Sequence, residues 1–160
     1  MNVIVAPADR AALWTALPTL PVTWDALPAE GVTLPDGLRF RRIDAPDHTP
    51  CLYVTLLESE PFYTQLEDGE GDYTDEERAD PDAVIARHYD EADELMHAMV
   101  AEASHVLGES SERHKRRGAS WLLEDRTLTV ADVQWDKEEP IQVCVWLLPP
   151  GLTPFSVGLI

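Results

Sequence analysis

The chain has 160 residues, 44% of them hydrophobic, a size and composition typical of one folded domain over residues 1–160. Thirty Asp and Glu residues against 12 Lys and Arg give a formal net charge of −18. This charge disfavours binding to nucleic acid or to an anionic membrane, because both require clustered cations. No stretch is apolar enough for a transmembrane helix and no signal peptide is visible, so we expect a cytoplasmic protein.

The N-terminal part of the chain predicts a short edge strand at residues 2–6 and then a short helix. Asp9 is expected to cap this helix and Pro18 to end it. The inner face of the helix carries Leu13, Trp14 and Leu17. Four prolines and Gly31 interrupt residues 18–37, which predicts an irregular packed segment that holds Trp24.

Two longer strands are predicted at residues 38–43 and 51–58. The second is apolar on both faces, which is typical of a central strand. The chain has two cysteines, Cys51 and Cys144, and each lies in an apolar run. We expect two buried thiols that pack as small hydrophobic groups, with a disulfide between neighbouring strands as the alternative.

A helix over residues 81–107 has the strongest pattern in the sequence. Apolar side chains recur at alternating spacings of four and three, which places them on one stripe of a helix. The stripe consists of Ile85, Tyr89, Ala92, Met96, Met99, Ala103 and Val106. Asp80 is expected to cap the helix and Gly108 to end it. The stripe favours packing on the chain's own sheet, with a coiled coil as the alternative.

Three strands follow a polar linker at residues 109–118 and are expected to form an antiparallel meander. They are predicted at residues 119–123, 126–135 and 141–148. Apolar positions change face in the middle strand, which predicts a β-bulge near Ala131 and Asp132. The last strand is apolar on both faces, so we expect the tail, residues 149–160, to pack back. The basic run 113–117 is expected to interact with the C-terminal dipole of the long helix and with nearby carboxylates.

The segment 58–80 combines ten carboxylates with one cation and three aromatic residues. A solvated loop and a partner-binding surface both fit this composition. On a binding surface the aromatic side chains would form the buried centre, and the carboxylates would steer a basic partner toward it. The candidate partner-binding residues are Phe62, Tyr63, Glu67, Asp68, Glu70, Asp72, Tyr73, Asp75, Glu76 and Glu77.

Motifs for metal binding and catalysis are incomplete or missing. Asp68, Glu70 and Asp72 alternate as in a calcium loop, but a tyrosine stands where the loop needs glycine, so an EF-hand is rejected. Glu94 and His97 have the spacing of a di-metal helical bundle, but both lie away from the apolar stripe. There is no nucleophile elbow, phosphate loop or dinucleotide fingerprint. We therefore expect no metal and no cofactor, and the sequence favours a protein without catalytic residues.

These patterns predict an α+β fold with a mainly antiparallel sheet of about five or six strands. The long helix at 81–107 would cover one face, and the short N-terminal helix with the Trp24 segment would cover part of the other. The layout is similar in outline to bacterial toxin-immunity proteins, although the chain carries no motif specific to them.

The main functional hypothesis is an acidic, non-catalytic protein that binds a basic protein partner, as an inhibitor or immunity-type protein. One alternative is a small enzyme or small-molecule binder with a site beside the sheet, lined by His88 and Trp135. A second alternative is a structural domain that forms oligomers, such as a homodimer, through the long helix. A concave polar pocket would favour the small-molecule site, whereas an acidic face with exposed aromatic side chains would favour the binding protein.

Overall fold

The computed structural model describes residues 1–60, 75–115, 117–136 and 139–160. Its strands are β1 (Asn2–Val3), β2 (Val32–Thr33), β3 (Arg39–Asp44), β4 (Pro50–Glu58), β5 (Glu112–Arg113), β6 (Gly118–Leu122), β7 (Thr127–Val133) and β8 (Gln142–Leu148). Its α-helices are α1 (Pro7–Ala16), α2 (Asp75–Ala79) and α3 (Pro81–Leu107), and short 3₁₀ helices span Leu17–Thr19 and Trp24–Ala26. None of these helices is both long and apolar enough to cross a membrane.

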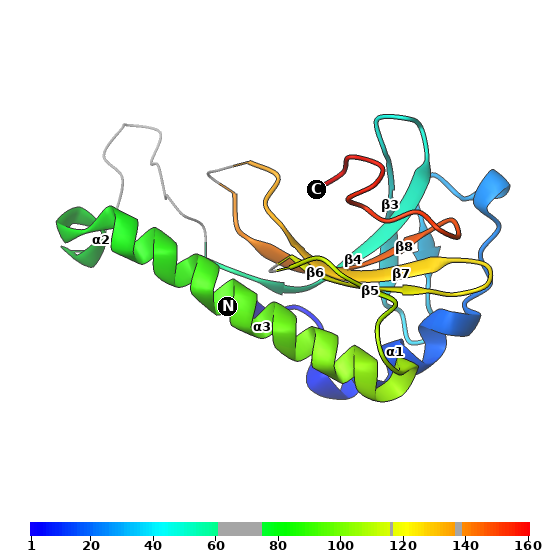
Figure 1. Cartoon of the computed structure of the whole chain (residues 1–160), viewed down its shortest axis with the longest axis horizontal. Helices are drawn as coiled ribbons and strands as arrows, with labels where there is room; N and C mark the ends of the chain where they lie inside the picture. Colours follow the sequence, from blue (N-terminus) through cyan, green and yellow to red (C-terminus); the bar gives the residue numbers. More distant parts are fainter. Residues whose placement is uncertain (61–74, 116, 137–138) are drawn as a thin grey trace.

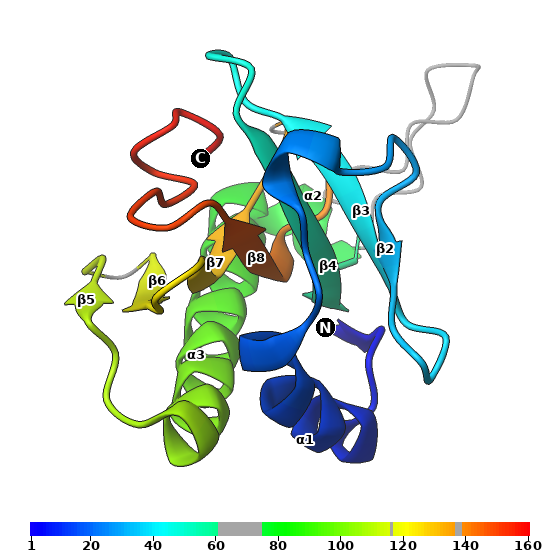
Figure 2. The same cartoon turned by 90° about the vertical axis from the view of Figure 1, so that its right-hand side faces the viewer.

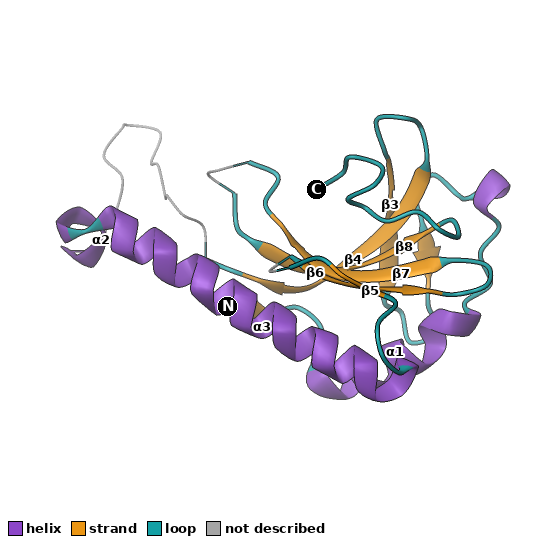
Figure 3. Cartoon of the chain, in the orientation of Figure 1, coloured by secondary structure: helices purple, strands orange, loops and turns teal. Residues whose placement is uncertain are grey.

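All eight strands belong to one antiparallel sheet, which confirms the predicted α+β fold (Figure 3). The strand order is β2-β3-β4-β8-β7-β6-β5, and β1 pairs with β4 beside β3. The sheet has two strands more than the sequence predicted. The additional strands β2 and β5 are only two residues long each, which is too short for an alternating pattern to be recognised. The apolar strands β4 and β8 are central, as predicted.

Helix α3 has the predicted boundaries. Asp80 caps it by accepting a hydrogen bond from the Ala83 N–H at 3.1 Å, and Gly108 ends it with a positive φ of 84°. The helix packs across β6, β7 and β8. Two predicted stripe residues, Tyr89 and Val106, are nevertheless 46% and 44% exposed. Figure 1 shows that the N-terminal turns of α3 extend past the sheet.

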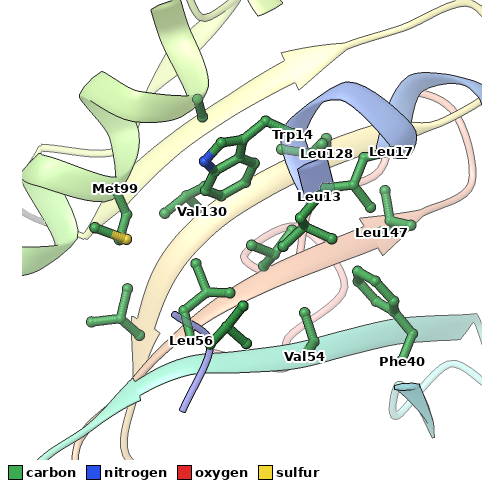
Figure 4. Close-up of a cluster of buried hydrophobic side chains, with 14 of the residues drawn as sticks. Leu13, Trp14, Leu17, Phe40, Val54, Leu56, Met99, Leu128, Val130 and Leu147 are labelled. Carbon is green, nitrogen blue, oxygen red and sulfur yellow. The ribbon is translucent and has the colours of Figure 1, made fainter. Parts of the chain in front are cut away.

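The main core lies between the sheet and both α1 and α3, which share one face (Figure 2). In Figure 4, Trp14 of α1, Leu17 of the following 3₁₀ helix and Met99 of α3 lie around Val130 and Leu147 of the sheet. The prediction that α1 and the Trp24 segment cover the other face is wrong, because a strand buried on both faces does not specify which element covers each. Asp9 also lies within the first turn of α1, whose cap position is Ala6.

The C-terminal tail packs back on the sheet, as predicted, and it covers the second face (Figure 1). Its side chains Phe155 and Val157 pack against Cys144, Trp146 and Leu148 of β8. This second core explains the apolar positions on both sides of the central strands. It also shows that the predicted bulge in β7 is wrong, because the β7–β8 register is uniform and both strand faces are buried. The irregularity lies in β4 instead, between residues 55 and 57.

In the basic run, Arg113 belongs to β5, His114, Lys115 and Arg117 lie in the turn from β5 to β6, and residue 116 lies outside the described residues. The guanidinium of Arg117 sits 5.3 Å from the ring centre of Phe155 in the tail, and the His114 ring packs on the same phenyl group at 4.2 Å. The carbonyl of Gly108, which follows the last residue of α3, accepts a hydrogen bond from Trp121 Nε1 at 2.9 Å. Arg117 therefore packs on the tail, and its charge also acts on the nearby carboxylate of Asp132, in agreement with the predicted interaction with nearby carboxylates.

Candidate functional site

The predicted acidic segment is described in part. Seven of its candidate residues lie outside the described residues, and these are Phe62, Tyr63, Glu67, Asp68, Glu70, Asp72 and Tyr73. Asp75, Glu76 and Glu77 belong to α2. Arg87 of α3 forms an ion pair with Glu76, and this hydrogen-bonded contact lowers the pKa of the Glu76 carboxyl group. The charge of Glu76 is thus already balanced within the chain.

The two residues proposed for a small-molecule pocket lie on different elements. His88 is half-buried on α3, which packs on the first face of the sheet. Trp135 follows β7 and contacts Tyr53 and Trp146, with ring centres 5.9 and 6.0 Å away. These aromatic residues belong to the second face, where the tail packs. The aromatic contacts of Trp135 therefore do not involve His88.

A pocket of about 290 Å³ lies between α3, the β5–β6 turn and the end of β7. We call it the aspartate pocket, and it is lined by Tyr89, Asp90, Asp93, Arg117 and Asp132. The three carboxylates outnumber the single guanidinium, so the pocket has negative charge. Tyr89 is partly exposed, and its hydroxyl donates to Gln134 Oε1, which fixes the aromatic ring at this site.

Two carboxylate oxygens in the aspartate pocket are buried and accept no hydrogen bond, namely Oδ1 of Asp93 and Oδ1 of Asp132. Burial raises the pKa of the Asp132 carboxyl group, and the positive charge of Arg117 partly offsets this effect. Oδ1 of Asp93 lies 3.4 Å from His97 Nδ1, which contacts the backbone carbonyl of Asp93 more closely, at 2.7 Å. A buried carboxylate oxygen without a donor is costly, so a donor from outside would be bound favourably.

The strand alternation places Asp132 in the pocket. Leu128 and Val130 of β7 point into the main core under α1 and α3, and Asp132 is the next residue on that side. The negative charge of Asp93 on α3 acts on Asp132 and contributes to its raised pKa. Sequence analysis missed this site because it interpreted the same positions as a bulge. An uninterrupted alternation through residue 132 would have shown an acidic residue at a core-facing position.

Two other kinds of site, a metal centre and a reactive thiol, are not found among the described residues. They contain no group of three or more His, Cys, Asp or Glu side chains that could hold a metal ion. Glu94 and His97 are both exposed. Both thiols are free and fully buried, and burial raises the pKa values of Cys51 and Cys144 to about 12, so neither is a thiolate at neutral pH.

The alternative disulfide is not formed. Cys144 pairs with Thr55 across β4 and β8, and Cys51 is four residues earlier on β4. Four residues of extended strand span about 13 Å, whereas bridged cysteines have Cα atoms less than about 7 Å apart. The cysteines therefore serve the second core as apolar side chains.

The aspartate pocket and the acidic surface around it are the features on which a functional proposal can be built. Comparison with known proteins supplies no relative: no family model matches the chain, and no curated protein or solved structure matches it either.

Proposed function

We propose that the protein is a non-catalytic binding protein that engages a basic protein partner through the aspartate pocket. The observation that carries this proposal is the pair of buried carboxylate oxygens, on Asp93 and Asp132, that accept no hydrogen bond beside the partly exposed ring of Tyr89. A guanidinium or ammonium group of a partner would donate to these oxygens and balance their charge. The ring supplies apolar contact for the stem of such a side chain.

Exposed carboxylates lie along α2 and the N-terminal half of α3, the helix that supplies Asp90 and Asp93 to the pocket. They are Asp75 of α2, Asp80 at the cap of α3, and Asp82, Asp90 and Glu94 of α3. The N-terminal turns of α3 project past the sheet, which leaves them open to a partner (Figure 1). Carboxylates arranged around a binding site attract a basic partner and speed its encounter. The aromatic candidates of the preceding segment, Phe62, Tyr63 and Tyr73, remain proposed anchors for the same partner.

Inhibition of a basic enzyme, or immunity toward one, is the most concrete form of this proposal. Such a protein acts by covering its target, so it needs charge complementarity and no catalytic group. The cytoplasmic location expected from the sequence belongs to the same proposal. The oligomer alternative has less support, because the stripe residues Ala92, Met96 and Ala103 of α3 are buried within the chain itself.

The test compares partner capture by the wild-type protein with capture by two isosteric variants. Asp132→Asn removes one of the three carboxylate charges of the pocket. Glu124→Gln removes one exposed charge in the β6–β7 turn, at the other end of these strands. We expect proteins with basic surfaces to bind to wild type and to the Glu124 variant. Binding should weaken by about tenfold in the Asp132 variant. This is at the lower end of the affinity losses that follow removal of one member of a partly buried charge pair.

The salt dependence completes this test. Capture should fall as salt rises, because screening reduces the attraction between exposed charges. If the Asp132 variant retains the same partner with the same affinity as wild type, the pocket is not the binding site. If capture is insensitive to salt, the partner is not recognised by charge, and the proposed function is wrong.

A further inference from the structure

A second cleft, of about 280 Å³, lies where β4 changes its edge partner. Strand β3 pairs with residues 50–53 of β4, and β1 pairs with residues 57–58. Val54 and Thr55 lie between the two partners and line the cleft. The register shift of β4 against β8 occurs at the same place, and such an irregularity bends a strand. The cleft is thus a product of the sheet topology.

The cleft contains two arginines that have no carboxylate partner. Arg39 donates from Nε and Nη2 to the backbone carbonyl of Glu30, at 3.0 and 2.7 Å. Arg41 makes no hydrogen bond or ion pair with the residues that the structure describes. The two side chains lie on one face of β3, about 7 Å apart along the strand. By contrast, Arg42, the next residue along β3, is paired with Asp44 at 2.9 Å.

Tyr53, the direct cross-strand partner of Arg41, forms an aromatic wall of the cleft. Its ring stacks on Trp146, with centres 5.1 Å apart and planes at 25°. The Tyr53 hydroxyl has no hydrogen-bond partner among the described residues, so it is available as a donor beside Arg41. A guanidinium next to a phenol is a suitable pair of donors for an oxyanion.

The other end of the cleft is a fixed polar group centred on Gln142. Its Oε1 accepts hydrogen bonds from Thr55 Oγ1 at 3.3 Å and from Trp135 Nε1 at 3.4 Å. Its Nε2 donates to Glu58 Oε1 at 2.7 Å. These bonds orient Glu58 and leave its second oxygen without a donor from the described residues. This end of the cleft therefore accepts hydrogen bonds, whereas the arginine end donates them.

We propose that this arginine cleft binds a small dianion, a phosphate monoester or a dicarboxylate, whose opposite end carries an amine or hydroxyl group. Arg39, Arg41 and the Tyr53 hydroxyl hold the oxyanion, and Glu58 accepts a hydrogen bond from the amine or hydroxyl. Two guanidiniums without carboxylate partners favour a ligand with two negative charges. The volume lies just below the usual range of about 300–1,000 Å³, so the ligand is compact. This site is separate from the aspartate pocket, and its failure would leave the proposed function standing.

Calorimetric titration of the full chain with four probes tests the site. Phosphoethanolamine carries both groups, inorganic phosphate and succinate carry only the dianion, and ethanolamine carries only the amine and hydroxyl. We expect millimolar or tighter binding of phosphoethanolamine or of succinate, and none of ethanolamine. If phosphoethanolamine binds more tightly than succinate, the ligand is a phosphate monoester. If succinate binds more tightly, the ligand is a dicarboxylate. If none of the dianions binds at millimolar concentration, the proposal is overturned.

Two variants identify the residues that hold the probe. Arg41→Gln should weaken dianion binding by about tenfold or more, because it removes a charged donor. The control Arg113→Gln removes an exposed arginine of β5, outside the cleft, and should leave affinity unchanged. Equal losses in both variants would show a general effect of net charge and contradict the site. Glu58→Gln should reduce the preference for phosphoethanolamine over inorganic phosphate, and an unchanged preference would exclude the role assigned to Glu58.

Discussion

Replacing Asp132 with asparagine should stabilise the fold while it weakens partner binding. Oδ1 of Asp132 is buried without a hydrogen bond, and burial raises the pKa of this carboxyl group. An unsatisfied buried polar group costs about 1–3 kcal/mol. One oxygen is affected and Arg117 offsets part of the effect, so we expect a gain of about 1 kcal/mol in the free energy of unfolding. In a chain of 160 residues this corresponds to a rise in Tm of about 2–4 °C.

The pH dependence of this gain has a definite sign. The folded-state pKa of Asp132 lies above the ordinary value of 3.8. Below pH 3.8 the group is protonated in both the folded and the unfolded chain, so its ionisation does not affect the free energy of unfolding. As pH rises from 3.8 through the folded-state pKa, the cost of ionising the buried group develops, and above that pKa it is complete. The asparagine variant should therefore exceed wild type in stability at neutral pH and match it in acid.

Urea unfolding followed by tryptophan fluorescence, at pH 7 and again below the ordinary Asp pKa, measures both quantities. Glu124→Gln is the matched control, because Glu124 is exposed and its substitution also removes one negative charge. We expect the control to change the free energy of unfolding by less than about 0.5 kcal/mol, as is usual for surface substitutions. A variant of Asp132 that is less stable than wild type at pH 7 would refute the reasoning, since it would show that the carboxylate makes a net stabilising contact.

Three further predictions concern the fold. Glu102→Ala should lower the free energy of unfolding by about 2 kcal/mol, because the Arg10 side chain, which is only 7% exposed, loses its carboxylate partner. This loss should shrink as pH falls through the lowered pKa of Glu102. Gly118→Ala should destabilise in thermal denaturation by about 2 kcal/mol or more, since a Cβ there would meet a β7 carbonyl oxygen at 2.0 Å, whereas Gly151→Ala, with similarly positive φ but open space, should cost less. Both cysteines should react with a thiol reagent only after unfolding, because their pKa values are about 12, and rapid labelling of the native protein would contradict their burial.

The sequence by itself determined the elements whose signals are local. Helix α3 follows from the spacing of its apolar residues and from Asp80 and Gly108 at its ends, all within one continuous segment. The central strands β4 and β8 follow from apolar residues on both faces. The acidic composition suggested a basic partner, which remains a proposal. These features could be predicted because each depends on neighbouring residues and on the period of one helix or strand.

Only the tertiary structure decided which surfaces meet. Asp93 and Asp132 come from a helix and a strand 39 residues apart, and each alone is an ordinary acidic residue near an apolar pattern. The arginine cleft depends on the exchange of β3 for β1 along the edge of β4, so Arg41 and Glu58 share a cleft only after three strands have paired. The side of the sheet taken by α1 is fixed by long-range packing in the same way. Burial and charge at these positions arise from contacts between distant segments, which the periodicity of a single segment does not encode.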